Sequence, residues 1–404
     1  MIIESFDIIE WSVLCTLALC TLFQFYWYLR YLCAPVRRLR QTRQQPTSPL
    51  HGENGNGLPS VSVLVSARNA GEDMEDYIHA LLAQDYPEFE VIVVDDGSED
   101  NTRDIIDRYR TQDARLRSTF VPRGARVRST KKLALTLAAK AARYDILLLT
   151  DADCVPESTH WIAEMVKGFR KTKDPINGQM VNDQMVNDIV LGYGAYFYRP
   201  GVVNRLVRYD TLFNGLHYLG AALCGHPYMG VGRNLAYSKS LFFDTGGFTR
   251  LMTNRAGDDD LFVNHVATAD NTSVVLTPDS YTWSPAKRTF RQWWQQKRRH
   301  LSVSPSYRPE TKRRLLFEPL TRGFFYAAVL VILIYSLRTS YIVPLYIALA
   351  LFLLRWLMQT VVINLSARRM NQHGFSPLTI LGMDIFLPLV NLWMLIIPNK
   401  NNKW

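Results

Sequence analysis

The sequence predicts an α/β protein with a mostly parallel sheet, attached to a membrane by apolar helices at both ends of the chain. Two observations support this fold class: strands and amphipathic helices alternate in the middle of the 404 residues, and long apolar blocks flank that region. The formal net charge of +10 agrees with basic flanks beside anionic lipid, so it does not indicate a nucleic-acid partner. The five cysteines form no CxxC pair and no disulfide pattern, which fits a reducing compartment.

The first apolar block, residues 8–29, is predicted to be a transmembrane helix. It is long enough to cross a bilayer, and its end is rich in aromatic residues, as at a membrane interface. Arginines follow it at once, and neither a basic leading region nor a small-residue cleavage site indicates a signal peptide. We therefore expect residues 1–43 to form an anchor with a basic flank. Residues 44–60, rich in Pro, Gly and Asn, are expected to form a flexible linker.

The soluble domain is expected over residues 61–310, where apolar runs alternate with helical patterns. Three strands are predicted: one that begins at residue 61, one over residues 90–94 and one over residues 145–150. Helices are predicted over residues 76–84, 103–110 and 131–142. The strands end at Arg68 with Asn69, at Asp95 with Asp96, and at Asp151 with Asp153. In parallel sheets ligands bind beyond the carboxyl ends of the strands, so these three ends are expected to converge on one site.

The carboxylates after two of these strands indicate a bound divalent cation. The chain has neither a GxGxxG nor a GxxxxGK[ST] loop, which argues against the common nucleotide loops. Paired carboxylates suit Mg²⁺ or Mn²⁺, whose other ligands come from phosphate and water. A bare acidic pair is more often a solvated turn or a helix cap. Here both DDG and DAD close buried strands in one α/β unit, which favours a site.

The C-terminal region, residues 311–404, contains three further candidate spans. They cover residues 324–336 with an extension back toward 316, then 341–365 and 378–397. Basic residues at 312–314 and 368–369, with those after the first span, predict four crossings and a cytoplasmic central domain. Asp384, Pro388 and Asn391 are costly in lipid, so their face is expected to meet protein, an interface or water, and a re-entrant segment stays open.

Several motifs occur in the order seen in one enzyme family. VSVLVSARN, VVDDGSEDNT, KKLALTLAAKA with LLLTDADC, GVGRNLAYSK, GDDDLFV and QKRRH resemble the motifs of family 2 glycosyltransferases over residues 61–300. The resemblance implies a GT-A fold and transfer of a sugar, with inversion, from a nucleotide diphosphate to a hydroxyl. It assigns Asp95 and Asp96, with Arg68 nearby, to the nucleoside. It further assigns Asp151 to the donor and Asp153, with Asp151, to the metal. Lys132 or its neighbour Lys131 is expected to contact phosphate or the acidic cleft, although a lysine at a helix start is more often solvated surface.

An inverting transfer also needs a base, and GDDDLFV supplies the candidates. Matching the glycine of the family motif makes Asp259 the base, whereas matching the spacing to Leu261 makes it Asp258. We prefer Asp259. An acidic cap on a helix that begins near Leu261 is the alternative for one of the three aspartates. In GVGRNLAYSK, Gly232 and Asn234 are expected at the acceptor, although an ordinary bend explains the glycines equally well.

The segment TFRQWWQQKRRHL predicts an interfacial amphipathic helix near residues 286–303. The family has QxxRW here: Gln296 and Arg299 match, and His300 stands in place of the tryptophan. Arg298 and Arg299 are expected to bind the donor diphosphate. His300 is expected at the acceptor, and the missing tryptophan puts processive synthesis in doubt.

The expected partners are a nucleotide-diphosphate sugar, with a UDP-sugar preferred, a lipid-linked or glycan acceptor, and membrane lipid. A processive polysaccharide synthase is the alternative within the enzyme class. A nucleotidyltransferase would use the same carboxylates and Mg²⁺, and a noncatalytic membrane scaffold would not depend on Asp153. The tandem QMVNDQMVND, residues 179–188, is interpreted as a tolerated loop extension.

Overall fold

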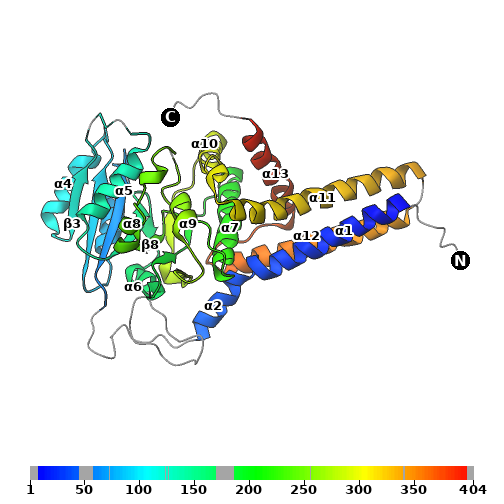
Figure 1. Ribbon diagram of the computed structural model, residues 1–404, viewed down its shortest axis with the longest axis horizontal. Helices are drawn as coiled ribbons and strands as arrows, with labels where there is room; N and C mark the ends of the chain where they lie inside the picture. The colour runs from blue at the N-terminus through cyan, green and yellow to red at the C-terminus, as the bar shows by residue number, and fades with distance from the viewer. Residues whose placement is uncertain are drawn as a thin grey trace. The chain divides into compact units, whose positions relative to one another are not determined.

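The computed structural model describes residues 8–44, 58–71, 73–122, 124–125, 127–169, 186–254, 256–339 and 342–397. The chain divides into two compact units, one of Met1–Val36 with Arg308–Trp404 and one of Arg37–Tyr307 (Figure 1). Most of the predicted linker and of the tandem repeat lies outside the described residues.

The unit Arg37–Tyr307 is built on a seven-stranded sheet in the order β3-β2-β1-β4-β8-β6-β9. Strands β1 to β4 are parallel, β8 is antiparallel to both β4 and β6, and β9 is parallel to β6. The mostly parallel sheet expected from the sequence is therefore confirmed. Its strands are β1 Val61–Ala67, β2 Phe89–Asp95, β3 Leu116–Phe120, β4 Ile146–Asp151, β6 Ile189–Leu191, β8 Leu235–Ser238 and β9 Thr272–Val274.

The first three helices of the first half lie close to the predicted ranges, and a fourth, short helix was not predicted. They are α3 Met74–Leu82, α4 Thr102–Gln112, α5 Thr130–Ala141 and α6 Trp161–Val166, the last followed by a 3₁₀ turn, Lys167–Phe169. Alternate side chains of β1, such as Val63 and Val65, pack in one buried cluster with residues of α3, α4 and α6. Since β1 and β2 are buried along almost their whole length, they form a rigid base for the polar residues at their ends.

The second half adds a small sheet and several helices. The sheet has the order β5-β10-β7, from Val155–Pro156, Thr282–Ser284 and Gly194–Tyr196. The helices are α7 Val202–Leu223, α8 Lys239–Asp244, α9 Asp260–Val266 and α10 Phe290–Leu301, with 3₁₀ turns at Thr249–Leu251, Pro278–Ser280 and Ser304–Ser306. Helix α10 occupies the segment predicted to be interfacial and begins with a capping box of Thr289 and Gln292. A buried ion pair of 2.6 Å between Lys297 and Asp210 joins α10 to α7.

The other unit consists of long apolar helices. They are α1 Ile8–Trp27, α11 Pro309–Thr339, α12 Val343–Arg369 and α13 Pro377–Ile396. Helix α1 continues through a π-helical turn, Tyr28–Leu32, into the basic helix α2 Ala34–Gln44, most of which, from Arg37, belongs to the unit Arg37–Tyr307. Within the described ranges, four segments are long and apolar enough to cross a membrane: Glu10–Thr42, Pro309–Thr339, Val343–Arg369 and Pro377–Ile396. This matches the predicted one N-terminal and three C-terminal spans, although α11 starts earlier than expected. Helix α1 packs against α11 and α12 through Leu17, Phe325 and Ala348 (Figure 1).

A buried polar cluster joins these helices to one another. Asp384 of α13 accepts hydrogen bonds from Arg355 at 2.8 Å and from Gln359 at 2.7 Å, both on α12. Arg322 of α11 lies 3.3 Å from the same carboxylate. Asp384 is 1% exposed, so its face of α13 contacts protein, which is one of the environments expected for it.

Candidate functional site

The carboxyl ends of β1, β2 and β4 lie side by side in the sheet. Ala67 of β1 pairs with Asp95 of β2, and Ser66 of β1 pairs with Asp151 of β4. The strand register therefore brings two of the three predicted strand ends next to the third. Burial of the strands sets where their terminal carboxylates stand.

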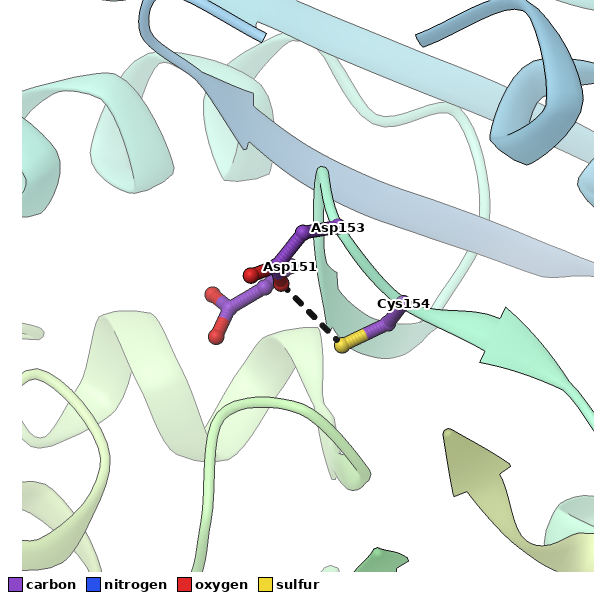
Figure 2. A group of neighbouring side chains, drawn as sticks. All are labelled: Asp151, Asp153 and Cys154. Carbon is purple, nitrogen blue, oxygen red and sulfur yellow. Dashed lines mark hydrogen bonds between the residues drawn. The ribbon is translucent and has the colours of Figure 1, made fainter. Parts of the chain in front are cut away.

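Asp151 and Asp153 form an acidic pair at the end of β4 (Figure 2). One oxygen of each lies within 4.8 Å of the other and of the Cys154 sulfur. Asp151 is paired with the Lys131 ammonium at 2.7 Å, whereas no cation pairs with Asp153 among the described residues. Two neighbouring carboxylates fit Mg²⁺ or Mn²⁺. The Cys154 sulfur is engaged with Ser284 at 2.9 Å, and burial raises the pKa of the thiol, so it is a poor ligand for a hard cation.

The charges around this pair favour a cation at Asp153. Burial and the negative charge of Asp151 raise the pKa of Asp153, while Arg233 and Lys287 oppose the rise. Burial also acts to raise the pKa of Asp151, but Lys131, together with Arg233 and Arg299, outweighs it and the pKa of Asp151 is lowered. A divalent cation would relieve the repulsion between the two carboxylates.

Asp96 presents a free acceptor at the end of β2. Its Oδ2 accepts a 2.7 Å hydrogen bond from Thr130, while its buried Oδ1 has no partner among the described residues. Burial raises the pKa of Asp96, against the effects of Thr130 and Arg68. The neighbouring Asp95 instead accepts from the Ser98 backbone N–H at 2.9 Å and closes the turn after the strand. Of the two predicted nucleoside ligands, Asp96 is thus the one with an unused buried oxygen.

The adjacent residues Lys131 and Lys132 of α5 point to different places. Lys131 lies between two acids, 2.7 Å from Asp151 and 3.2 Å from Asp258. Lys132 is fully buried and donates to the backbone carbonyls of residues 251, 254 and 256 at 2.7 to 2.8 Å. Since these bonds use all three N–H groups of its ammonium, the assignment of Lys132 to the donor phosphate does not fit the structure. Lys131, the alternative considered from the sequence, faces the acidic pair.

The acidic run 258–260 places its three side chains in three environments. Asp258 faces Lys131. Asp259 caps α9: its oxygens accept from the backbone N–H groups of Asp260 and Gly232, each at 2.8 Å. Asp260 is buried and accepts from the Tyr307 hydroxyl at 3.1 Å. The acidic cap considered from the sequence is therefore present at Asp259, but this does not prevent a second role, because each of its oxygens keeps a lone pair.

The two predicted acceptor residues after the GVG turn differ. A Cβ atom at Gly232 would lie 3.4 Å from Asp259 Oδ2, so the missing side chain keeps the approach to this carboxylate open. Asn234 is fully buried, accepts from Trp161 and donates to the carbonyls of residues 193 and 280. Its amide is used up in the core, so Asn234 supports the turn and does not offer hydrogen bonds to an acceptor.

Helix α10 brings the QxxR residues toward the same acids. Gln296 donates to the Tyr196 hydroxyl at 2.9 Å, and Arg299 is among the cations that lower the pKa of Asp151. Arg298 is half-buried on the same helix, and His300 is exposed on its last turn, within electrostatic reach of Asp258.

Sequence reasoning missed Arg233. It lies between Gly232 and Asn234, and it is among the cations acting on both Asp151 and Asp153. The signal in the sequence was a basic residue directly after the GVG turn, a segment already expected at the acceptor.

Comparisons with known proteins agree with these observations. A model of glycosyl transferase family 2 matches residues 62–222, and one of glycosyl transferase family group 2 matches residues 181–354. The chain belongs to the family 2 glycosyltransferases. It is 40% identical over 80 residues to the putative teichuronic acid biosynthesis glycosyltransferase TuaG of Bacillus subtilis, and 34% identical over 99 residues to the poly-beta-1,6-N-acetyl-D-glucosamine synthase of Staphylococcus epidermidis. These matches cover 19% and 24% of the chain, and only 32% and 23% of the relatives' own lengths.

A longer match and a solved structure extend the likeness. The probable glycosyltransferase YdaM of Bacillus subtilis is 23% identical over 258 residues, which cover 62% of this chain and 56% of that protein. The mannosyltransferase PcManGT of Pyrobaculum calidifontis superimposes with a TM-score of 0.53 at 20% identity, over 93% of this chain and 99% of that one. This likeness confirms the GT-A fold.

Proposed function

We propose that the protein transfers a sugar, with inversion, from a nucleotide-diphosphate sugar to a hydroxyl of a lipid-linked or glycan acceptor, and that the reaction depends on Mg²⁺ or Mn²⁺. The observation that carries this proposal is the arrangement at the end of β4. Asp153 has no cationic partner among the described residues, while Lys131 connects its neighbour Asp151 to the acidic run at Asp258. Lys131 thus contacts both the proposed metal-binding pair and the acidic run that contains the candidate bases.

The donor is assigned to the strand ends. The unused Oδ1 of Asp96 suits a hydrogen-bond donor of the base or ribose, with Arg68 and Asp95 beside it. Asp153 and Asp151 would hold the metal, which when bound neutralises charge on the leaving diphosphate. Arg298, Arg299 and Gln296 of α10 are assigned to the diphosphate, because guanidinium groups bind phosphate through paired hydrogen bonds.

The acceptor hydroxyl is assigned to the opposite side of the donor sugar, near Asp259, Gly232 and His300. Its oxygen bonds to the anomeric carbon while the bond from that carbon to the diphosphate oxygen breaks. The hydroxyl proton passes to the Asp259 carboxylate, and the nucleoside diphosphate leaves. Asp259 is preferred over Asp258 because burial raises the pKa of Asp259 and two backbone N–H groups orient its carboxylate, whereas Asp258 is engaged in an ion pair with Lys131.

The predicted membrane helices support a lipid-linked acceptor. Four spans with basic flanks support a multi-pass protein whose catalytic unit is cytoplasmic, where nucleotide sugars and lipid-linked acceptors would meet. A processive polysaccharide synthase is the second candidate, favoured by the similarity to a poly-beta-1,6-N-acetyl-D-glucosamine synthase. His300 in place of a tryptophan favours single additions. The sequence favours a UDP-sugar as the donor, and the solved PcManGT structure contains GDP-Man and Mn²⁺, so both nucleotide classes belong in the test.

The test is sugar transfer and donor hydrolysis by the full chain in detergent, with a panel of UDP- and GDP-sugars, Mg²⁺ or Mn²⁺, and added membrane lipid. We expect metal-dependent turnover of one donor, lost in Asp153→Asn. Asp270→Asn is the matched control, since Asp270 is exposed on a loop before β9. Product length separates single addition from a polymer. Full transfer by Asp153→Asn would contradict the metal assignment.

A further inference from the structure

Arg233 is held in place by its backbone. Its carbonyl oxygen accepts hydrogen bonds from the hydroxyls of Thr150 at 3.1 Å and Thr282 at 3.0 Å. Thr150 directly precedes Asp151 on β4, and Thr282 begins β10. The turn that carries Arg233 is therefore fastened to the strand that carries the acidic pair.

The guanidinium of Arg233 is also fixed. It stacks 4.3 Å from the centroid of the Tyr196 ring and donates to the Ala195 carbonyl at 3.1 Å. The Tyr196 hydroxyl is itself held by Gln296 of α10. Gly194 leaves room for this arrangement, because a Cβ atom there would lie 3.1 Å from Arg233 Cβ and 3.5 Å from Cζ. The side chain is thus pre-organised by β7 and α10, with most of its N–H groups left for another partner.

The charge of Arg233 is not cancelled by a direct ion pair. Among the described residues no carboxylate lies within ion-pair distance of it. At the end of β4, Thr150, the residue before Asp151, bonds to the Arg233 carbonyl, and Asp151 and Asp153 are the carboxylates that act on the Arg233 charge. A fixed cation beside two carboxylates has two opposite effects on ligands. It repels a bare divalent cation, and it attracts a phosphate that arrives with that cation.

We propose that Arg233 binds the diphosphate of the donor and so makes the metal and the nucleoside diphosphate bind together. The inference rests on the proposed function for the existence of that donor. Arg233 weakens the binding of metal alone at Asp151 and Asp153. Once a diphosphate bridges metal and guanidinium, the same charge strengthens the complex, so the site fills with the metal-bound donor in preference to free metal.

The experiment measures binding to the full chain in detergent by titration calorimetry. The probes are Mn²⁺ alone, UDP and GDP with Mn²⁺, and UMP and GMP with Mn²⁺, for the wild type and Arg233→Gln. The variant should bind Mn²⁺ alone more tightly, and it should bind the preferred diphosphate with Mn²⁺ at least about tenfold more weakly, which is the effect of one charge-assisted contact. Binding of the monophosphate should change much less.

Two further variants complete the test. Arg233→Lys keeps the charge and should recover part of the diphosphate affinity, whereas Arg205→Gln, an exposed residue on α7, should match the wild type. A general loss of structure would weaken all probes together, and that result, or unchanged affinities in Arg233→Gln, would overturn the inference while leaving the proposed function standing. A wild type that binds neither UDP nor GDP would overturn both.

Discussion

Three consecutive acids, Asp258, Asp259 and Asp260, are held by different partners, and this difference predicts the pH dependence of transfer. Burial and the charge of Asp258 raise the pKa of Asp259, while Lys131 opposes them, and the buried Asp260 lies beside it. A base works only when deprotonated, so a raised pKa moves the acid limb of kcat/KM above about 4, the ordinary range of aspartate. In Asp258→Asn one of the charges that raise the pKa is gone, so the limb should shift to lower pH. The measurement is the pH profile of both proteins.

The companion variant Asp259→Asn should lose about 10² to 10⁴ in kcat with the donor still bound, which is the usual size of general base catalysis. Donor affinity serves as the folding control, because the amide that this substitution introduces would put an NH₂ group against one of two backbone N–H donors. If Asp258→Asn abolished transfer and Asp259→Asn retained it, Asp258 would be the base.

The first turn of α5 connects three parts of the site through consecutive residues. Thr130 contacts Asp96, Lys131 contacts Asp151 and Asp258, and Lys132 holds the loop that leads into the acidic run. The paired variants Lys131→Met and Lys132→Met should therefore differ. Lys132→Met leaves buried carbonyls unpaired and should lower the free energy of unfolding by about 3 kcal/mol.

Lys131→Met should leave stability within about 1 kcal/mol of the wild type, because its ion pairs are partly exposed, while transfer falls at least about tenfold. Thermal unfolding in detergent and transfer rates check both variants. Equal loss of stability in the two would contradict the separation of roles.

A comparison of the two halves of the α/β unit shows which elements could be predicted from the sequence. Regular elements of the first half were predicted because β1, β2, β4 and their helices have long, clear periodicity. The strands after residue 185 have only three or four residues each, too few for a pattern. Helix α7 was missed since it buries polar groups such as Arg208 and Asp210 and has no clean apolar stripe.

The site residues that could be predicted are likewise those marked by a local pattern in the sequence. The aspartates at strand ends were found because an apolar run stops at them, which is visible in one dimension. The separate roles of Lys131 and Lys132, and the burial of Asn234, depend on the direction each side chain takes. The partners that decide this include a carbonyl 124 residues from Lys132 and the Trp161 ring 73 residues from Asn234 along the chain.

At the scale of the whole molecule, the chain combines an α/β unit with a unit of apolar helices, and the packing of these helices against one another needs its own explanation. Apolar side chains give little preference for one helix over another in lipid, so polar contacts contribute to their association. Two arginines, Arg322 and Arg355, and two acids, Glu318 and Asp384, form a buried cluster of zero net charge across α11, α12 and α13. Gln24 of α1 accepts from Arg355 at 3.2 Å and so ties in the first span.

Charge balance in this cluster yields the last prediction. Asp384→Asn leaves one positive charge uncompensated among buried groups and should destabilise the helical unit by about 3 to 5 kcal/mol, the usual effect of removing one partner of a buried pair. Adding Arg355→Met restores neutrality, because Arg322 keeps Glu318 as its partner, so the double variant should be more stable than the single one despite carrying two changes. Unfolding midpoints in detergent, with Thr379→Ala near the exposed start of α13 as the control, measure this order. A double variant less stable than Asp384→Asn would show that the individual hydrogen bonds of Arg355, and not the net charge, hold the helices together.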